Sequence, residues 1–250
     1  MKPRILSSAR LSFPLAAAIA ALLAGTQAHA ATFYWDNNNT TLGFGNAGGN
    51  WAQNSTSGGT SARWKTDPTG VAAGSATQAT ANTDIFHFGT TTFGLGAGTI
   101  TVNVAGVTMG DTFYGSASDA VVLSGGAITF GAAKTITVKN ATNTINSVVG
   151  GAATSLTKAG SGSILLTAAN TYTGTTIING GTLDLGGSTA TGSLASSVLT
   201  LGGGSLSYTR TGGTTQAFTT TNINVGGTSQ ISAVAGNTLK LETVLRGAGG

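Results

Sequence analysis

The sequence predicts an all-β protein that winds into a solenoid, because it is poor in charge, rich in glycine and repeats at short intervals. Only 7% of the 250 residues are charged, whereas about 25% is usual in soluble domains, so helices stabilised by surface ion pairs are excluded. The 40 glycines disfavour helix wherever they fall. Disorder would combine low hydrophobicity with high net charge, and a chain that is 40% hydrophobic with a formal charge of +4 has neither.

The first thirty residues are predicted to be a cleaved signal peptide. Three basic residues open the chain, the apolar segment 11–23 follows, and Ala28 and Ala30 form an A-x-A cleavage site before Ala31. The apolar segment is shorter than the about 20 residues that a membrane-spanning helix needs, so we expect export with loss of the leader and no transmembrane span. Cleavage removes three of the 11 basic residues, which nearly balances the seven acidic ones. The scattered lysines and arginines predict no nucleic-acid partner.

The rest of the chain divides by composition into two parts. Residues 31–114 hold all three tryptophans and most of the phenylalanines, and we expect an aromatic-rich N-terminal cap followed by the first coils. Residues 115–250 consist of short apolar alternations separated by glycine and asparagine, which predict β-strands. Four such segments are 135–138, 163–166, 182–185 and 222–225.

These strands also repeat. Gly-Gly followed by alternating residues occurs at 125–130, 180–185 and 203–208, and in a degenerate form at 226–231. The last three copies start 23 residues apart, and a fixed period of about 20–50 residues indicates a solenoid. Alternation along the strand places Leu183 and Leu185 inside and Asp184 in water. One apolar row is marginal by itself, so the coils are expected to stack.

One segment carries a longer motif. It opens with Leu156-Thr157-Lys158-Ala159-Gly160-Ser161-Gly162-Ser163, continues through Asn170-Thr171-Tyr172-Thr173-Gly174, and reaches Gly180-Gly181-Thr182-Leu183. Residues 156–186 resemble the autotransporter-associated β-strand repeat, also called the passenger-associated transport repeat. Ile164 stands where that family usually has leucine, and Thr175 replaces a common second glycine.

The glycines, asparagines and aliphatic residues of the motif each suggest a structural role. Gly160 and Gly162 are expected at turns that need a positive φ. Asn170 and Asn179 are expected at corners, in the left-handed region and bonded to their own backbone. The expected core residues of the segment are Ile164, Leu166, Ile177 and Leu183.

The resemblance implies a type V secretion passenger of a Gram-negative bacterium. Such a chain is exported by its leader, threaded through an outer-membrane translocation barrel, and folded outside as a right-handed parallel β-helix, with the repeat assisting that passage. A barrel would show alternating strands of about ten residues with aromatic girdles, and the 250 residues show none. We therefore expect that the chain is truncated at Gly250 and that the barrel lies on the missing C-terminal part.

The tryptophans have two interpretations. Trp35, Trp51 and Trp64 either cover the open end of the solenoid as part of the cap, or form an exposed platform on which sugars stack. A cap buries all three, whereas a platform exposes at least two in one groove. The cap is the expectation, because large aromatic side chains are usually buried.

The residues predict no catalytic, cofactor or metal site. After leader removal His87 is the one histidine, and there is no cysteine, so metal sites built from these residues are excluded. Asp84 could orient His87 in a triad, but no G-x-S-x-G motif surrounds a serine. The G-x-G-x-x-G match at 43–48 lacks a preceding strand and a following helix. No two of the seven acidic residues pair two apart on one strand.

The expected function is that of an exported structural passenger, at the cell surface or outer membrane or secreted, which acts as a stalk or scaffold in adhesion or a biofilm matrix. Surface polysaccharide or a host or matrix surface would be its partner. The alternative is a secreted β-helix that binds or cleaves polysaccharide. An ice-binding face is a third class, but the outward residues Thr129, Asp184 and Ser207 break the threonine ladder that it needs.

Overall fold

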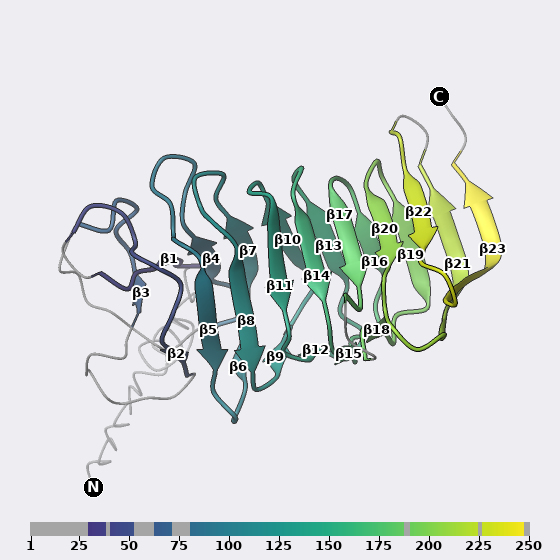
Figure 1. The fold of residues 1–250 in the computed structure, drawn as a ribbon, viewed down its shortest axis with the longest axis horizontal. Coiled ribbons are helices and arrows are strands. Elements are labelled where there is room, and N and C mark those ends of the chain that lie inside the picture. The colour runs from purple at the N-terminus through teal and green to yellow at the C-terminus, as the bar shows by residue number, and fades with distance from the viewer. Residues whose placement is uncertain are drawn as a thin grey trace, which may run out of the picture.

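The structure is a computed structural model of the chain and describes residues 30–38, 41–52, 63–71, 81–187, 191–224 and 227–247. Within these ranges the regular secondary structure is entirely β-strand, and the strands wind into one elongated solenoid (Figure 1). The predicted signal peptide, including the cleavage-site residue Ala28, lies outside the described residues except for its last residue, Ala30, at which they begin.

One wall of the solenoid is a ten-stranded sheet. Its order from the C-terminal end is β23-β21-β19-β16-β13-β10-β7-β4-β1-β3. The strands are β1 (Thr32–Trp35), β3 (Trp64–Lys65), β4 (Ile85–Phe88), β7 (Asp111–Tyr114), β10 (Lys134–Val138), β13 (Leu156–Ala159), β16 (Thr176–Ile178), β19 (Val198–Leu201), β21 (Thr215–Ile223) and β23 (Thr238–Arg246).

The opposite wall is an eight-stranded sheet in the order β2-β5-β8-β11-β14-β17-β20-β22. The strands are β2 (Asn50–Trp51), β5 (Gly98–Val102), β8 (Val121–Gly125), β11 (Thr142–Ile145), β14 (Ser163–Leu166), β17 (Thr182–Leu185), β20 (Ser205–Tyr208) and β22 (Gln230–Ala233). Two narrow sheets complete the coils: β6 (Val107–Thr108), β9 (Ile128–Thr129) and β12 (Val149–Gly150) form one, and β15 (Ala169–Asn170) and β18 (Ser193–Leu194) form the other.

Successive coils pair in parallel along both walls. As the chain advances from left to right in Figure 1, the strands of the front wall point down and those of the rear wall point up, so the coil is right-handed. The exception to parallel pairing among the described strands is β3, which runs antiparallel to β1 and covers the N-terminal edge of the larger sheet. The predicted right-handed parallel β-helix is confirmed.

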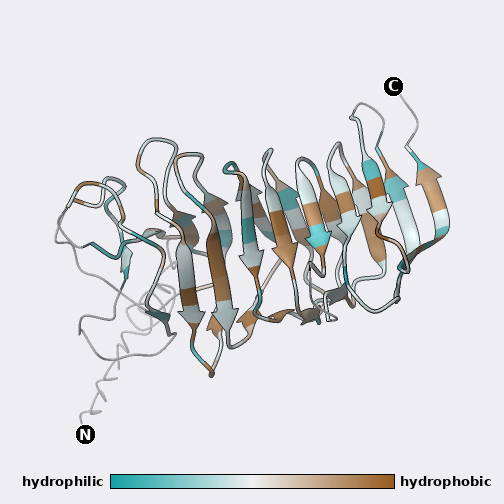
Figure 2. Cartoon of the chain, viewed as in Figure 1, coloured by the Kyte–Doolittle hydropathy of each residue, from teal (hydrophilic) through white to brown (hydrophobic). Residues whose placement is uncertain are grey.

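The core is a set of apolar rows that run along the solenoid axis. In the smaller wall, Ile145, Leu166, Leu185 and Tyr208 stand in register on successive coils and are fully buried. The neighbouring row contains Ile164, Leu183 and Leu206. Figure 2 shows apolar residues recurring from strand to strand along the walls. Side chains alternate between core and exterior along each strand, as the sequence pattern predicted.

Three of the four core residues expected in segment 156–186 are buried, and one is not. Ile164, Leu166 and Leu183 are fully buried, whereas Ile177 points outward and Ile178 takes the inward position. The prediction for Ile177 was wrong by one residue. The inward positions of β16 are Ile178 and the polar Thr176, which the sequence pattern does not mark as buried. A slip of one residue reverses the face of every side chain on a strand.

Two of the predicted Gly-Gly copies occupy equivalent positions in successive coils. The copies at 180–185 and 203–208 form β17 and β20, which lie side by side with Leu183 opposite Leu206. The prediction was wrong for the copy at 125–130, which is not structurally equivalent to them, because its residues Ile128–Thr129 form β9 in a narrow sheet. The last copy lies in the expected wall as β22, but its register is shifted relative to the sequence repeat, because Leu206 pairs with Ile231. The predicted strand 222–225 is observed at 222–223, as the end of β21.

Candidate functional site

The segment with the recognised motif spans two adjoining coils in the middle of the solenoid: β13 and β14 belong to one coil, and β16 and β17, which pair with them, belong to the next. Its strands β13, β14 and β17 pair in parallel with coils on both sides, and β16 lies between β13 and β19. β15 follows β14 and pairs with β18 in a separate two-stranded sheet. The unusual chemistry of this segment lies inside the solenoid.

Lys158 is the feature that sets this coil apart. Its side chain is fully buried at an inward position of β13, in register with Ile136 on one side and Ile178 on the other. The ammonium donates hydrogen bonds to the carbonyl oxygens of Ala159 at 2.8 Å and of Gly160 and Gly180 at 3.0 Å. Because Gly160 and Gly180 occupy the same corner in two adjoining coils, after β13 and after β16, the lysine ties one coil to the next.

Burial lowers the pKa of Lys158 from 10.5 to about 8, because the charged form loses its hydration. The unfolded chain therefore holds this proton up to a higher pH than the folded chain does. The contribution of Lys158 to the free energy of unfolding rises with pH between about 8 and 10.5, and its charge penalty is fully present below that window.

Replacing Lys158 with methionine is expected to destabilise the solenoid by about 1–3 kcal/mol at pH 7, because three carbonyl oxygens lose a charged donor. The deficit relative to the unmodified chain should widen as the pH rises from 8 to 10.5. Urea unfolding of both proteins across this range measures the effect. Lys139→Met, at an exposed position, is the control, and an equal response of the two variants would refute the role of the buried ammonium.

The two motif glycines act for different reasons. Gly160 has a φ of +77°, which confirms the expected turn conformation. The prediction of a positive φ for Gly162 was wrong. Gly162 is needed for space, because a Cβ there would lie 1.8 Å from the carbonyl oxygen of Asn140 in the preceding coil.

Asn179 lies at the corner between β16 and β17, as expected, whereas Asn170 lies in β15. Neither Asn170 nor Asn179 has the expected positive φ. Asn170 is buried in β15, where its Oδ1 accepts from the Val149 amide at 2.9 Å. Its Nδ2 donates to the carbonyls of Ala168 at 2.8 Å and Ser193 at 3.0 Å. The side chain thus joins three successive coils, whereas Asn179 is exposed.

The three tryptophans are fully buried, as the cap interpretation predicted and the sugar platform did not. Trp64 packs edge-on against Trp35 and Trp51, each with a centroid distance of 5.0 Å. Beside them the buried carboxylate of Asp36 pairs with the Lys65 ammonium at 2.7 Å. The first coil is therefore closed by an aromatic cluster and a buried ion pair.

Sequence reasoning missed an outward aromatic row on the larger wall. Tyr34, His87 and Phe113 occupy one register position on β1, β4 and β7, with centroid distances of 4.7 and 5.0 Å. The Lys139 ammonium lies 5.6 Å above the Phe113 ring and extends the row. The rings cover one another's faces, so this row stabilises the coils more than it offers stacking surfaces to a sugar.

His87 sits in the middle of this row with its Nδ1 buried and without a hydrogen-bond partner. Burial lowers the pKa of His87 below its usual 6.5. Protonation of His87 therefore favours the unfolded chain, and the free energy of unfolding decreases as the pH drops below about 6.5. His87→Phe, which keeps a ring between Tyr34 and Phe113, is expected to remove that component of the acid sensitivity. Thermal melts from pH 7 to pH 5 check this, and a parallel decline of both proteins would contradict it.

The structure does not assemble the catalytic arrangements considered from the sequence. His87 faces away from Phe86 and Phe88, as expected, but Asp84 is engaged elsewhere: its carboxylate accepts from the amides of Ala31 at 3.2 Å and Ala81 at 2.7 Å. Segment 43–48 lies between β1 and β2 and leads into no helix. Among the described residues, no three histidine or acidic side chains gather as a metal site would require.

Comparison with known proteins gives one finding. Residues 156–185 match the family model described as the Passenger-associated-transport-repeat, and these residues form the two adjoining coils that Lys158 joins. No curated protein and no solved structure matches the chain. No helix in the described part of the chain is long and apolar enough to cross a membrane.

Proposed function

We propose that the chain is an exported structural passenger that crosses the outer membrane through a translocation barrel and serves at the cell surface as a stalk or scaffold. The transport repeat within a β-solenoid fits an autotransporter passenger. The observation that carries the proposal is the position of the repeat: it spans two adjoining coils, paired with further coils on both sides, and its interior Lys158 ties the two coils to each other.

A coil of this kind suits a chain that must fold after passing through a pore. Its hydrogen bonds and apolar rows form between each coil and its neighbour, so order can propagate coil by coil from one that is already folded. The chain has no cysteine, so no disulfide loop can form before passage. We propose that the repeat assists secretion by providing a coil stable enough to start this stacking.

The outer faces suit a scaffold that contacts other surfaces through uncharged hydrogen-bonding groups. On the larger wall one outward row runs Thr135, Thr157, Ile177, Thr200 and Asn222. Isoleucine and asparagine interrupt the threonines, so this row is no regular ice-binding ladder. We propose adhesion or biofilm-matrix contact as its use.

Protease treatment of intact bacterial cells that produce the chain together with its translocation barrel tests the proposal. The solenoid is expected at the surface or in the medium, where added protease reaches it without cell lysis. Retention in the periplasm or cytoplasm would overturn the proposal. Lys158→Met should reduce the surface amount more than Lys139→Met does, because the second variant leaves the repeat coil intact.

The alternative function, binding or cleavage of polysaccharide, loses its main support with the burial of all three tryptophans. We propose that the chain does not catalyse a reaction. Incubation with pectin, alginate and xylan, followed by measurement of released reducing ends, decides the point. Turnover above that of a boiled sample would favour the alternative.

A further inference from the structure

The corner between β16 and β17 contains the only Asn-Gly pair in the sequence, Asn179-Gly180. Glycine has no Cβ that would hinder its backbone nitrogen, so this nitrogen can approach the side-chain carboxamide of the preceding asparagine. Any other residue after asparagine carries a Cβ that obstructs the approach. The sequence thus marks this corner as the place where backbone nitrogen can attack an asparagine side chain, if the fold leaves both groups accessible.

Both reacting groups of this pair are accessible in the folded chain. The Asn179 side chain is exposed, and no hydrogen bond to another described residue holds its carboxamide. The Gly180 amide donates none of the backbone hydrogen bonds among the described residues, although the Asn179 amide beside it donates to the Lys158 carbonyl at 2.9 Å. The fold therefore anchors the corner but leaves the Gly180 nitrogen and the Asn179 carboxamide unengaged.

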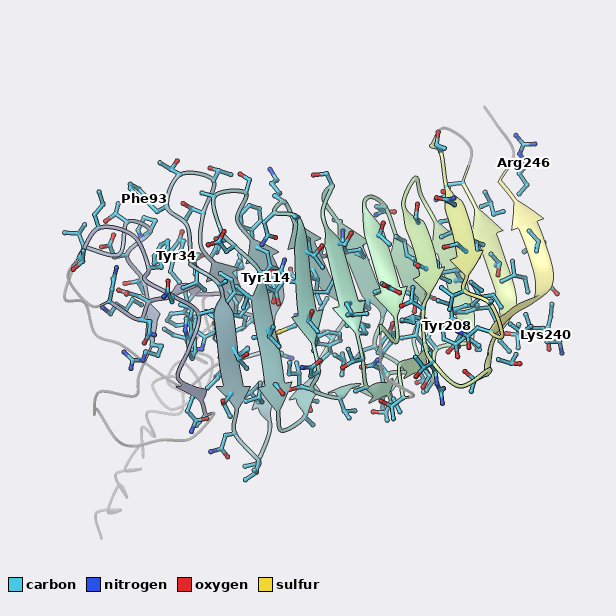
Figure 3. All side chains as sticks on the ribbon, viewed as in Figure 1. Tyr34, Phe93, Tyr114, Tyr208, Lys240 and Arg246 are labelled. Atoms are coloured by element: carbon cyan, nitrogen blue, oxygen red, sulfur yellow. The ribbon has the colours of Figure 1, made fainter. Side chains whose placement is uncertain are left out.

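The next coil leaves space beside both groups, because it also has glycines at this corner. The neighbouring corner leads from β19 into β20, the strand that ends at the Tyr208 labelled in Figure 3. A Cβ at Gly202 would lie 2.3 Å from Asn179 Oδ1, and a Cβ at Gly204 would lie 2.8 Å from the Gly180 nitrogen. A side chain at either position would crowd the reacting groups, so the two glycines keep the surroundings of the pair open.

We propose that Asn179-Gly180 is a site of spontaneous deamidation in the folded solenoid. The Gly180 nitrogen forms a bond to Asn179 Cγ, the Cγ–Nδ2 bond breaks, and Nδ2 leaves as ammonia with the proton of the Gly180 amide. The product is a cyclic succinimide, which water then opens. Attack of water at Cγ gives aspartate, and attack at the main-chain carbonyl carbon gives isoaspartate, in which the backbone runs through Cβ and Cγ. Both products carry a carboxylate in place of the neutral amide.

Isoaspartate is expected to weaken the contacts of this corner with the coils on both sides, because it adds one atom to the backbone. On one side, the Ile178 carbonyl accepts from the amides of Gly202 and Gly204 at 2.8 and 3.2 Å. On the other side, the Gly180 carbonyl accepts from the Lys158 ammonium at 3.0 Å. A longer corner cannot keep both sets of hydrogen bonds without strain. The modified chain is therefore less stable, and its amount grows as the exported chain ages.

Peptide mapping by mass spectrometry tests the proposal on the purified chain, held in neutral buffer and sampled over weeks, with parallel samples unfolded in guanidinium chloride. Asn179 should deamidate in the folded chain at a rate comparable to that of the unfolded chain. The exposed Asn146, followed by Ser147, is the matched control: its Oδ1 accepts from Thr167 Oγ1 at 2.7 Å, and the Ser147 amide donates to the Leu123 carbonyl at 3.3 Å. Folding should slow the control pair at least ~10-fold, because it reacts only after local opening.

Two variants separate the parts of the proposal. Gly180→Ala should slow deamidation of the folded chain at least ~10-fold, because the added Cβ hinders the nitrogen, and circular dichroism checks that this variant is folded. Asn179→Asp has the carboxylate on a normal backbone, so it should unfold at the same urea concentration as the unmodified chain, and the isoaspartate form should unfold at a lower one.

Three results would overturn the site: no conversion of Asn179 in the folded chain, equal slowing of Asn179 and Asn146 by folding, or an unchanged rate in Gly180→Ala. Unfolding of the isoaspartate form at the same urea concentration as Asn179→Asp would overturn the effect of the longer corner.

Discussion

Replacing Leu183 with aspartate is expected to abolish folding of the solenoid. Leu183 is fully buried between Ile164 and Leu206 of the adjoining coils. The variant loses about 1.5–3 kcal/mol of apolar burial and places a carboxylate among aliphatic groups, which costs several kcal/mol more. The sum is comparable to the whole stability of a typical domain, about 5–15 kcal/mol. Circular dichroism and limited proteolysis of the variant check the outcome.

The adjoining position supplies the control. Asp184 points outward and accepts a hydrogen bond from Thr209 Oγ1 at 2.7 Å. Asp184→Leu loses that bond but buries no charge, so it should cost about 1 kcal/mol and leave the chain folded. Similar losses of thermal stability in the two variants would refute the inward and outward assignment of β17.

The second large effect is expected at Gly162. Alanine there would bring its Cβ to 1.8 Å from the Asn140 carbonyl oxygen and 2.8 Å from Val138 Cγ1. The Gly162 amide is also bonded to the Val138 carbonyl at 2.9 Å, so the two coils cannot separate without losing that hydrogen bond. We expect Gly162→Ala to cost about 3 kcal/mol or more, the upper end of overpacking penalties, as measured by urea unfolding.

Gly180→Ala, at the same corner of the next coil, is its matched control. A Cβ at Gly180 would lie 3.2 Å from the Gly160 carbonyl oxygen, so a shift of a few tenths of an ångström accommodates it. The loss should be clearly smaller than at Gly162. If both variants lost the same stability, close approach between coils would not explain the glycine of the motif.

The alternating strands were predictable from sequence because their inward rows are apolar on both walls. Leu183 and Leu206 follow glycine pairs at equal distances and do stack. Ile177 was assigned to the wrong face because a buried threonine beside it looks like a surface residue. Thr176 is tolerated inside since its Oγ1 lies 2.9 Å from the Tyr172 hydroxyl, which satisfies it.

The interior of the repeat coil could not be predicted in the same way. A lysine in a strand normally marks the outer face, yet Lys158 is buried because the next coil brings the Gly180 carbonyl to the same corner. The outward row of Tyr34, His87 and Phe113 draws on three strands separated by irregular loops, so no constant spacing in the sequence indicates it.

Disulfide trapping tests most directly whether successive coils stack in this register, and the absence of native cysteine makes the test clean. Thr144 pairs with Leu165, and Leu165 pairs with Asp184. Neighbouring strands lie about 4.8 Å apart, within disulfide range, whereas strands two coils apart exceed the about 7 Å limit. Thr144→Cys with Leu165→Cys should therefore oxidise to a cross-linked chain, and Thr144→Cys with Asp184→Cys should not. Equal cross-linking of the two pairs, or none in the first, would contradict the stacked solenoid.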